Sequence, residues 1–273
     1  MKKKKISKFI IYSILILGVI IVIYPFFYMV INSFKEGPDI MHNPTALPKK
    51  ISFDGYISIF KTLNIGRLFF NSFFISASVA FLNVVLSSMV AYGIVKSGLK
   101  HKNLLLSFIL GTMMIPGILL LIPTYMMLYE WDWINTYKAL IIPSMVTAYN
   151  VFLMIQFMKQ LDDAYLEAAR IDGANEFKVF TRVVLPMVKP ALATLTILTF
   201  MGAWNDFLGP LLYLRDESKM TLQLALFNFQ SEVPGENAQQ IWAATTMITL
   251  PVTLLFFSLQ KSFIKAFTGV GLK

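Results

Sequence analysis

The sequence predicts an all-α integral membrane protein with six transmembrane helices. Hydrophobic residues make up 56% of its 273 residues and charged residues only 14%, whereas a soluble domain carries about 25% charged residues. Mean hydropathy is +0.65. The apolar residues form stretches close to or above the roughly 20 residues that a helix needs to cross the hydrocarbon core. Polar stretches separate them, so each apolar stretch is expected to form one span.

The first span is expected at residues 9–34, which are 26 consecutive uncharged positions. Five lysines precede it in residues 1–8. A cleavable signal peptide would have an apolar region of about 7–15 residues, followed by a cleavage site of small residues. This stretch is longer and no such site follows it, so we expect a retained helix that is kinked or tilted at Pro25. Residues 35–67 form the polar connection that comes next.

The second span is expected at residues 68–95, a run of 28 uncharged positions that includes several serines and asparagines. Small and hydroxyl residues let helices pack closely in lipid, and amide side chains hydrogen-bond across a helix interface. The third span, at residues 104–129, is interrupted by Pro116, Gly117 and Pro123. A proline frees a backbone carbonyl that needs another partner, so these positions are expected to face protein or water.

The last three spans are expected at residues 139–158, 190–214 and 241–260. The fourth span contains Pro143 and Asn150, and the sixth contains Pro251. Between the fifth and sixth spans, residues 215–240 are expected to form a long polar loop.

Lysine and arginine counts predict the orientation of these spans. The N-terminal end, the second connection, the fourth connection and the C-terminal tail together carry 16 of these residues, and the three connections on the opposite side carry 8. Positively charged residues accumulate in cytoplasmic connections. Both termini are therefore expected in the cytoplasm, together with residues 159–189.

Residues 159–189, called here the polar hairpin, carry five acidic and five basic residues. A segment that binds an anionic membrane surface would be strongly basic. A charge-balanced segment between two apolar spans instead favours a docking surface for another protein.

The order of residues in the polar hairpin predicts two helices joined by a turn. The expected apolar face of the first helix comprises Leu161, Ala164, Tyr165 and Ala168, which have helical spacing. Asp172-Gly173 is expected to end this helix, because glycine readily adopts the left-handed conformation. Asn175 and Glu176 are expected to begin the second helix, and Pro186 marks its far end. The apolar stripe of the second helix is expected at Phe177, Phe180 and Val184.

The polar hairpin resembles the EAA loop of the membrane permeases of bacterial ABC importers. The matching pattern is Glu167-Ala168-Ala169, three residues, Gly173, nine residues, and then Val183-x-Leu185-Pro186. Val183 replaces the usual isoleucine. The chain is most similar to the carbohydrate-importer permeases, particularly the shorter partner of the maltose-type pair. A second stretch resembles the same branch, namely Trp204-Asn205-Asp206-Phe207-Leu208-Gly209-Pro210.

This resemblance implies the type I ABC importer permease fold, in which the loop forms cytoplasmic coupling helices that seat in a cleft of the ATPase. The residues that it assigns to this contact are Glu167, Ala168, Ala169, Asp172, Gly173, Leu185 and Pro186. It implies a second, related permease, two ATPase subunits and an extracytoplasmic sugar-binding protein as partners, and a di- or oligosaccharide as substrate. An ABC permease for another solute, such as a glycerol phosphate ester, is the alternative.

The resemblance also divides the chain. Residues 1–66 form an N-terminal transmembrane helix and an outer loop, 67–261 the importer core with the polar hairpin, and 262–273 a cytoplasmic tail. It implies that the loop at residues 215–240 contacts the binding protein and that the tail touches the ATPases. Relatives often carry one more glycine at the end of this tail.

The sequence lacks the residues and motifs that several kinds of catalytic and binding site require. There is no cysteine, which excludes disulfides and thiolate catalysis. No G-x-x-x-x-G-K-[ST] phosphate loop occurs, and the two histidines, His42 and His101, fall in loops. We therefore expect a transport subunit, not an enzyme, with no cofactor, no bound metal and no catalytic residue. ATP hydrolysis is expected on a separate subunit.

Asp206 is the acidic residue that falls within an expected span. An intramembrane acid is a candidate functional residue, so Trp204, Asn205 and Asp206 are candidate substrate or gate residues. Trp204 and Phe207 could stack on a sugar. The alternative is structural: Asp206 lies near the outer end of its helix, where capping or water would satisfy it, and aromatic residues pack helices more often than they bind ligands.

Two other function classes remain open at this point. An ion-coupled secondary transporter would have charged residues near the membrane midplane and two related halves, and neither a midplane charge pair nor an internal repeat is evident here. A membrane assembly or sensor protein would need no ATPase partner. Co-purification of an ATPase with the polar hairpin distinguishes the importer from both.

Overall fold

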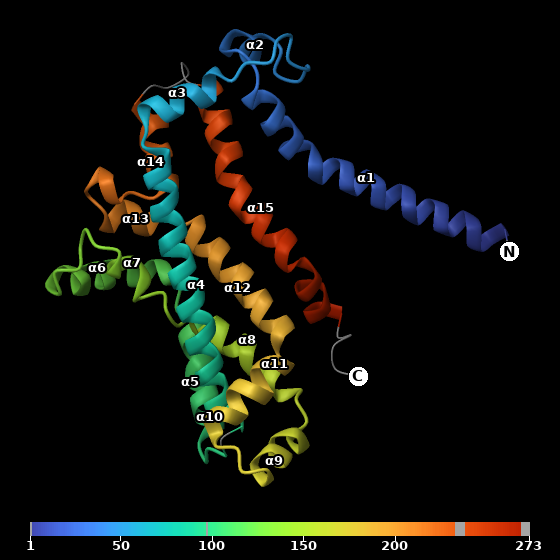
Figure 1. The fold of residues 1–273 in the computed structure, drawn as a ribbon, viewed down its shortest axis with the longest axis vertical. Coiled ribbons are helices and arrows are strands. Elements are labelled where there is room, and N and C mark those ends of the chain that lie inside the picture. The colour runs from blue at the N-terminus through green and yellow to red at the C-terminus, as the bar shows by residue number, and fades with distance from the viewer. Residues whose placement is uncertain (1, 97, 233–237, 269–273) are drawn as a thin grey trace. The chain divides into compact units, whose positions relative to one another are not determined.

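The computed structural model describes residues 2–96, 98–232 and 238–268 (Figure 1). Within these ranges the chain forms helices, turns and bends and no strand, which confirms the all-α prediction. The chain divides into two compact units. The first comprises Met1–Ile65 and Leu226–Pro251, and the second comprises Gly66–Ala225 and Val252–Lys273. The end of the expected cytoplasmic tail, residues 269–273, lies outside the described residues.

The first unit contains α1 (Lys2–Ser33), α2 (Gly37–His42), α3 (Asp54–Thr62) and the first part of α15 (Ala238–Thr268). α1 is one uninterrupted helix with Pro25 inside it, and its apolar side chains are largely exposed. Tyr28 of α1 makes an edge contact with Trp242 of α15, with ring centroids 5.4 Å apart. α3 meets the start of α15, where a Cβ at Gly55 would lie 2.7 Å from the carbonyl oxygen of Gln239.

The second unit is built around α4 (Ile65–Lys96), a continuous helix of 32 residues without proline. The other helices of this unit are shorter: α5 (Lys102–Met113), α6 (Leu121–Glu130), α7 (Lys138–Ile141), α8 (Ala148–Lys159), α9 (Asp163–Ile171), α10 (Glu176–Lys178), α11 (Leu185–Met187), α12 (Lys189–Trp204) and α13 (Leu208–Tyr213). Buried apolar side chains of α4, α8, the polar hairpin and α12 form its largest core cluster.

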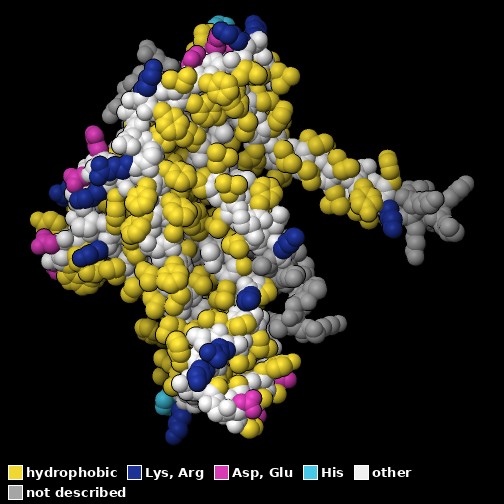
Figure 2. All heavy atoms as spheres, in the orientation of Figure 1, with side chains coloured by type: hydrophobic (Ala, Val, Ile, Leu, Met, Phe, Trp, Pro, Cys, Tyr) yellow, Lys and Arg dark blue, Asp and Glu magenta, His cyan; other side chains and the backbone are white. Residues whose placement is uncertain are grey.

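Three described helices are long and apolar enough to cross a membrane: Lys8–Ser33, Ile65–Lys96 and Ala238–Lys261. Two bent pairs pass the same test, Lys102–Met113 with Gly117–Glu130 and Glu176–Met187 with Lys189–Trp204. The described residues therefore hold three to five candidate spans, and the predicted number of six stays a prediction. Figure 2 shows hydrophobic side chains over much of the visible surface, as lipid contact requires.

Three of the expected spans that contain proline are interrupted, whereas Pro25 and Pro251 lie inside the uninterrupted helices α1 and α15. The third is bent by 86° between α5 and α6, next to Pro116. The fourth is divided at residues 142–147, which contain Pro143, leaving α8 with 12 residues. In the fifth expected span, the helix α12 ends at Trp204, ten residues before the expected end of the span at Leu214.

The expectation of a polar loop at residues 215–240 was wrong in part. This segment contains α14 (Leu222–Glu232), and α15 begins within it at Ala238. Leu222, Ala225 and Phe229 are buried and are spaced three and four residues apart, which is the pattern of a helix with one apolar face.

Candidate functional site

The polar hairpin contains a helix, a tight turn and a second helix. Asp162 begins α9, because its carboxylate accepts a hydrogen bond from the backbone nitrogen of Ala164 at 3.0 Å. Gly173 has φ +81°, a conformation that favours glycine. After the turn, the side chain of Asn175 accepts a hydrogen bond from the backbone nitrogen of Lys178 at 2.9 Å and begins α10. The turn at Gly173 and the cap at Asn175 agree with the sequence-based expectation, whereas the cap at Asp162 was not predicted.

The second helix of the polar hairpin differs from its expected apolar stripe. Val179–Val184 form a π-helical turn between α10 and α11, and such a turn is wider than an α-helical one. Phe180 and Val184 within this turn are buried, whereas Phe177, which lies in α10 before it, is 70% exposed. The inclusion of Phe177 in the buried stripe was wrong.

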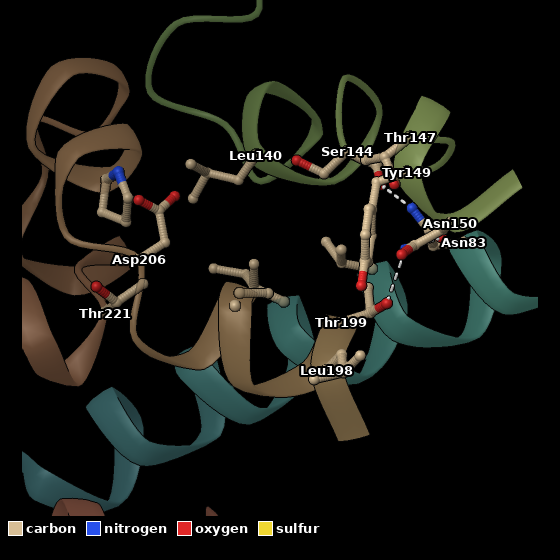
Figure 3. A pocket seen from close by; sticks show the side chains of 15 residues that line it. Asn83, Leu140, Ser144, Thr147, Tyr149, Asn150, Leu198, Thr199, Asp206 and Thr221 are labelled. Carbon is tan, nitrogen blue, oxygen red and sulfur yellow. Dashed lines mark hydrogen bonds between the residues drawn. The ribbon is translucent and has the colours of Figure 1, made fainter. Parts of the chain in front are cut away.

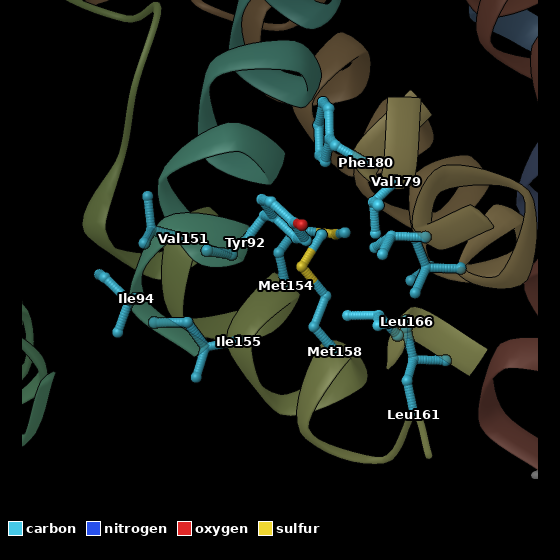
Figure 4. Close-up of a cluster of buried hydrophobic side chains, with 14 of the residues drawn as sticks. Tyr92, Ile94, Val151, Met154, Ile155, Met158, Leu161, Leu166, Val179 and Phe180 are labelled. Atoms are coloured by element: carbon cyan, nitrogen blue, oxygen red, sulfur yellow. The ribbon is translucent and has the colours of Figure 1, made fainter. Parts of the chain in front are cut away.

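The base of the polar hairpin is held by the largest core cluster (Figure 4). Leu161, Leu166 and Val179 of the hairpin are at most 4% exposed. They lie among side chains of α4 and α8, including Tyr92, Met154, Ile155 and Met158. This packing fixes the base of the hairpin to α4 and α8.

The outer surface of the polar hairpin exposes large apolar side chains. Tyr165 is 59% and Ile171 85% exposed, and charged side chains of the hairpin are exposed around them. Ala164 and Ala168 are also exposed beside Tyr165, so most of the expected apolar face of the first helix points away from the core. Exposed apolar groups that are surrounded by polar residues are typical of an interaction surface.

The residues expected to contact an ATPase fall into two groups. Ala169 and Leu185 are partly buried and pack against the core cluster. The others are exposed, namely Glu167, Ala168, Asp172, Gly173 and Pro186. The structure thus leaves most of the expected contact residues accessible to a partner.

One ion pair and two hydrogen-bonded residues of the hairpin, Arg170 and Glu176, connect the polar hairpin to the end of α4. The Nζ atom of Lys96, whose side chain is 4% exposed, lies 2.6 Å from Oδ1 of Asp163. This contact lowers the pKa of the Asp163 carboxyl, mainly through the hydrogen bond from Lys96. Arg170 pairs with Glu176 across the turn, with Nε and Oε1 2.8 Å apart, and Glu176 also accepts a hydrogen bond from the hydroxyl of Tyr92.

Sequence reasoning missed these contacts. Lys96 was interpreted only as a charge that sets topology, and its partner Asp163 is 67 residues away in the sequence. A charged residue at the end of a long uncharged helix was the available signal.

A second feature is a pocket of about 410 Å³ between α4, α8, α12 and the segment that divides α7 from α8 (Figure 3). We call it the central pocket. Its lining includes polar groups from each of these elements, and also Asp206 and Thr221 from the connections beside α13. The polar lining residues are Asn83, Ser144, Thr147, Tyr149, Asn150, Thr199, Asp206 and Thr221.

Hydrogen bonds between amides organise one end of the central pocket. The side-chain nitrogen of Asn150 donates to Oδ1 of Asn83 at 2.6 Å and to Oγ1 of Thr199 at 3.0 Å. The side-chain nitrogen of Asn83 donates to the carbonyl oxygen of Ser144 at 2.9 Å. Ser144 lies where the fourth expected span is divided, so Asn83 satisfies a carbonyl that the division frees.

The three candidate gate residues have different surroundings. Trp204 is 1% exposed and makes an edge contact with Phe69 of α4, with ring centroids 5.5 Å apart, so it packs helices. Asn205 is exposed and accepts a hydrogen bond from Gln223 at 3.4 Å. Asp206 lines the central pocket and accepts a hydrogen bond from the backbone nitrogen of Gly209 at 3.2 Å. Of the three, Asp206 alone reaches the pocket.

Comparison with known proteins gives a consistent picture. The family described as "Binding-protein-dependent transport system inner membrane component" matches residues 83–269. The arabinooligosaccharides transport system permease protein AraQ of Halalkalibacterium halodurans is 32% identical over 257 residues, covering 93% of this chain and 92% of that protein. The trehalose/maltose transport system permease protein MalG of Thermococcus litoralis is 30% identical over 265 residues, covering 94% of each.

A solved structure shows the same fold. A bacterial ABC transporter involved in the import of the acidic polysaccharide alginate superposes with a TM-score of 0.83 at 22% identity, covering 96% of this chain and 98% of that chain.

Proposed function

The chain belongs to the family of binding-protein-dependent transport system inner membrane components, and from this premise we propose that it is the permease subunit of an ATP-driven importer of di- or oligosaccharides. The chain is then a multi-pass membrane protein that forms half of a translocation pathway. A second, related permease forms the other half. This substrate class is supported by the names of two relatives, which describe transport of arabinooligosaccharides and of trehalose or maltose.

The polar hairpin carries the proposal. It combines exposed Tyr165, Ile171 and Phe177 with a charge-balanced surface, and its base is held by the core cluster. A separate ATPase would bury these side chains in a cleft, in contact with residues 167–173 and with Leu185 and Pro186. Closure of two such ATPases would displace the hairpin as a rigid element and change the balance between two packings of the membrane helices.

The central pocket is the proposed passage for the sugar within this subunit. Its amide, hydroxyl and carboxylate groups can exchange hydrogen bonds with sugar hydroxyls, and Tyr149, which is 52% exposed, can cover an apolar sugar face. A divided membrane helix beside a polar cavity is a recurring arrangement in transporter binding sites. Asp206 gates or contacts the sugar from the opposite end, and Trp204 and Asn205 support it.

The proposed topology has six spans, with α7 and α8 as one divided span and both termini in the cytoplasm. Residues 1–66 are then the N-terminal helix and outer segment, 67–261 the importer core, and 262–273 the cytoplasmic tail. The segment at residues 215–240 faces outward, where an extracytoplasmic sugar-binding protein would deliver the substrate.

Purification with bound partners tests the proposal. The chain should co-purify with an ATPase, and sugar together with its binding protein should stimulate ATP hydrolysis in the reconstituted complex. Ile171→Asp places a charge on the proposed docking surface and should release the ATPase. Leu47→Asp changes a residue that is 69% exposed in the outer segment and should retain it. A hairpin variant that binds the ATPase as wild type does would refute this docking surface.

A further inference from the structure

We propose that Tyr92 and Lys96, in the last turns of α4, are positioning residues that transmit movement of the polar hairpin to the central pocket. The proposal rests on the proposed function, because it presumes that an ATPase moves the hairpin. Neither residue belongs to the expected docking surface, and both are buried.

Lys96 binds the start of the polar hairpin. Its Nζ atom donates to the carbonyl oxygen of Leu161 at 2.8 Å as well as to Asp163 at 2.6 Å. These groups flank Asp162, the residue that caps α9. A single side chain of α4 therefore holds both sides of the point where the first hairpin helix begins.

Arg170 and Glu176 bind the turn of the hairpin to the same end of α4. The guanidinium of Arg170 contacts both carboxylate oxygens of Glu176, at 2.8 and 3.2 Å. It also donates to the carbonyl oxygen of Lys96 at 3.2 Å. Tyr92 donates its hydroxyl hydrogen to Glu176. The first and second hairpin helices are thus both attached to α4, by bonds that involve charged groups and are stronger than neutral ones.

α4 reaches from this attachment to the central pocket without interruption. Ile75, Val79 and Asn83 line the pocket, and Asn83 lies 13 residues before Lys96, roughly 20 Å along a helix that rises 1.5 Å per residue. α4 has no proline, whereas the chain beyond the hairpin turns by 80° before it enters α12. α8, on the other side of the hairpin, reaches the pocket only with its first turn, at Tyr149 and Asn150, and ends there at the divided segment.

Movement along α4 would act directly on the amides of the pocket. Asn83 accepts from Asn150 of α8 and donates to Ser144, so a shift of α4 changes the contacts that hold the divided segment. This gives the hairpin a route to the pocket that does not pass through a bend in the chain.

The test uses the complete complex in lipid nanodiscs or proteoliposomes, with Lys96→Met, Lys96→Arg and Tyr92→Phe. Lys96→Met removes the charge and retains an unbranched side chain, and Tyr92→Phe removes one hydroxyl. Lys100→Met is the matched control, since Lys100 is an exposed lysine near the same end of α4. The measured quantities are the amount of bound ATPase, ATP hydrolysis, and sugar transported per ATP hydrolysed.

We expect Lys96→Met and Tyr92→Phe to retain the ATPase and to lower sugar transported per ATP by about 5- to 10-fold, in the lower range of energetic coupling between distant sites. Lys96→Arg should restore most of the loss. Wild-type coupling in Lys96→Met and Tyr92→Phe would overturn the inference, and so would release of the ATPase by both, which would make them docking residues. Absence of an ATPase from the wild-type complex would instead refute the proposed function.

Discussion

Replacement of Gly173 tests whether the turn of the polar hairpin must keep its left-handed backbone. Gly173 has φ +81°, and a Cβ at this position would meet no atom within 4 Å. Alanine therefore introduces backbone strain without a steric clash. The strain amounts to about 1–2 kcal/mol for a residue with a Cβ in this conformation.

A hairpin that relieves this strain by changing its turn loses the hydrogen bond from the backbone nitrogen of Ala174 to the carbonyl oxygen of Ala169, now 3.0 Å long. The unbound hairpin can relax in this way, but the docked one cannot. Gly173→Ala should therefore weaken ATPase binding roughly 5- to 30-fold, the ratio that corresponds to 1–2 kcal/mol.

The assay is titration of the purified, nanodisc-embedded permease pair with its ATPase. Gly111→Ala is the matched control, because Gly111 lies in α5 with no positive φ and also has nothing within 4 Å of a Cβ. Gly173→Asn should weaken binding less than alanine does, since asparagine tolerates the left-handed region. Equal affinity of Gly173→Ala and Gly111→Ala would refute the reasoning.

Three further predictions concern other parts of the molecule. Gly209→Ala places a Cβ 2.5 Å from Oδ2 of Asp206 and 3.2 Å from Leu140, so it should displace the carboxylate and lower the thermal unfolding temperature, whereas an unchanged temperature would contradict this packing. The pKa of Asp163 is lowered, mainly by the hydrogen bond from Lys96, so its stabilising effect should be present above its ordinary pKa of about 3.9 and be lost as pH falls through the lower folded-state value. When the stability to unfolding is measured against pH, the loss of stability in the acid range should be smaller in Asp163→Asn than in the wild type. Identical profiles for the two proteins would count against the Lys96–Asp163 ion pair. Finally, in this cysteine-free chain, Glu217→Cys should react with an impermeant thiol reagent from outside and Lys178→Cys only after permeabilisation, and the reverse result would overturn the proposed topology.

Local patterns were sufficient to predict the features that depend on neighbouring residues. Composition indicated helices in a membrane, and the cap and turn residues of the polar hairpin predicted where α9 ends and α10 begins. Pro116 indicated where the third span bends, but Pro25 and Pro251 lie inside uninterrupted helices, and the division at residues 142–147 was not expected. In each case the deciding interactions lie within a few residues of one another along the chain.

Features that depend on distant partners could not be predicted in this way. The contact of Lys96 with Asp163 and the bonds of Asn83 with Asn150 join separate helices, and no local pattern specifies such pairs. Phe177 is exposed just before a π-helical turn at Val179–Val184, and the sequence has no simple signal for either feature. The helical spacing of the apolar residues in α14 was present in the sequence, but it was overlooked because the surrounding residues are polar.

The hydrogen bond from Asn83 to Ser144 constrains how this importer can evolve. Asn83 both lines the central pocket and donates to the carbonyl oxygen of Ser144. If the pocket is the passage for the sugar, as proposed, a mutation at Asn83 that suits a new sugar also leaves that carbonyl without this donor. Tyr149 and Leu198 line the same pocket, and in the described structure neither donates to the carbonyl oxygen of Ser144. Divergence in substrate choice among descendants of this chain should therefore accumulate at those two positions while position 83 keeps its amide.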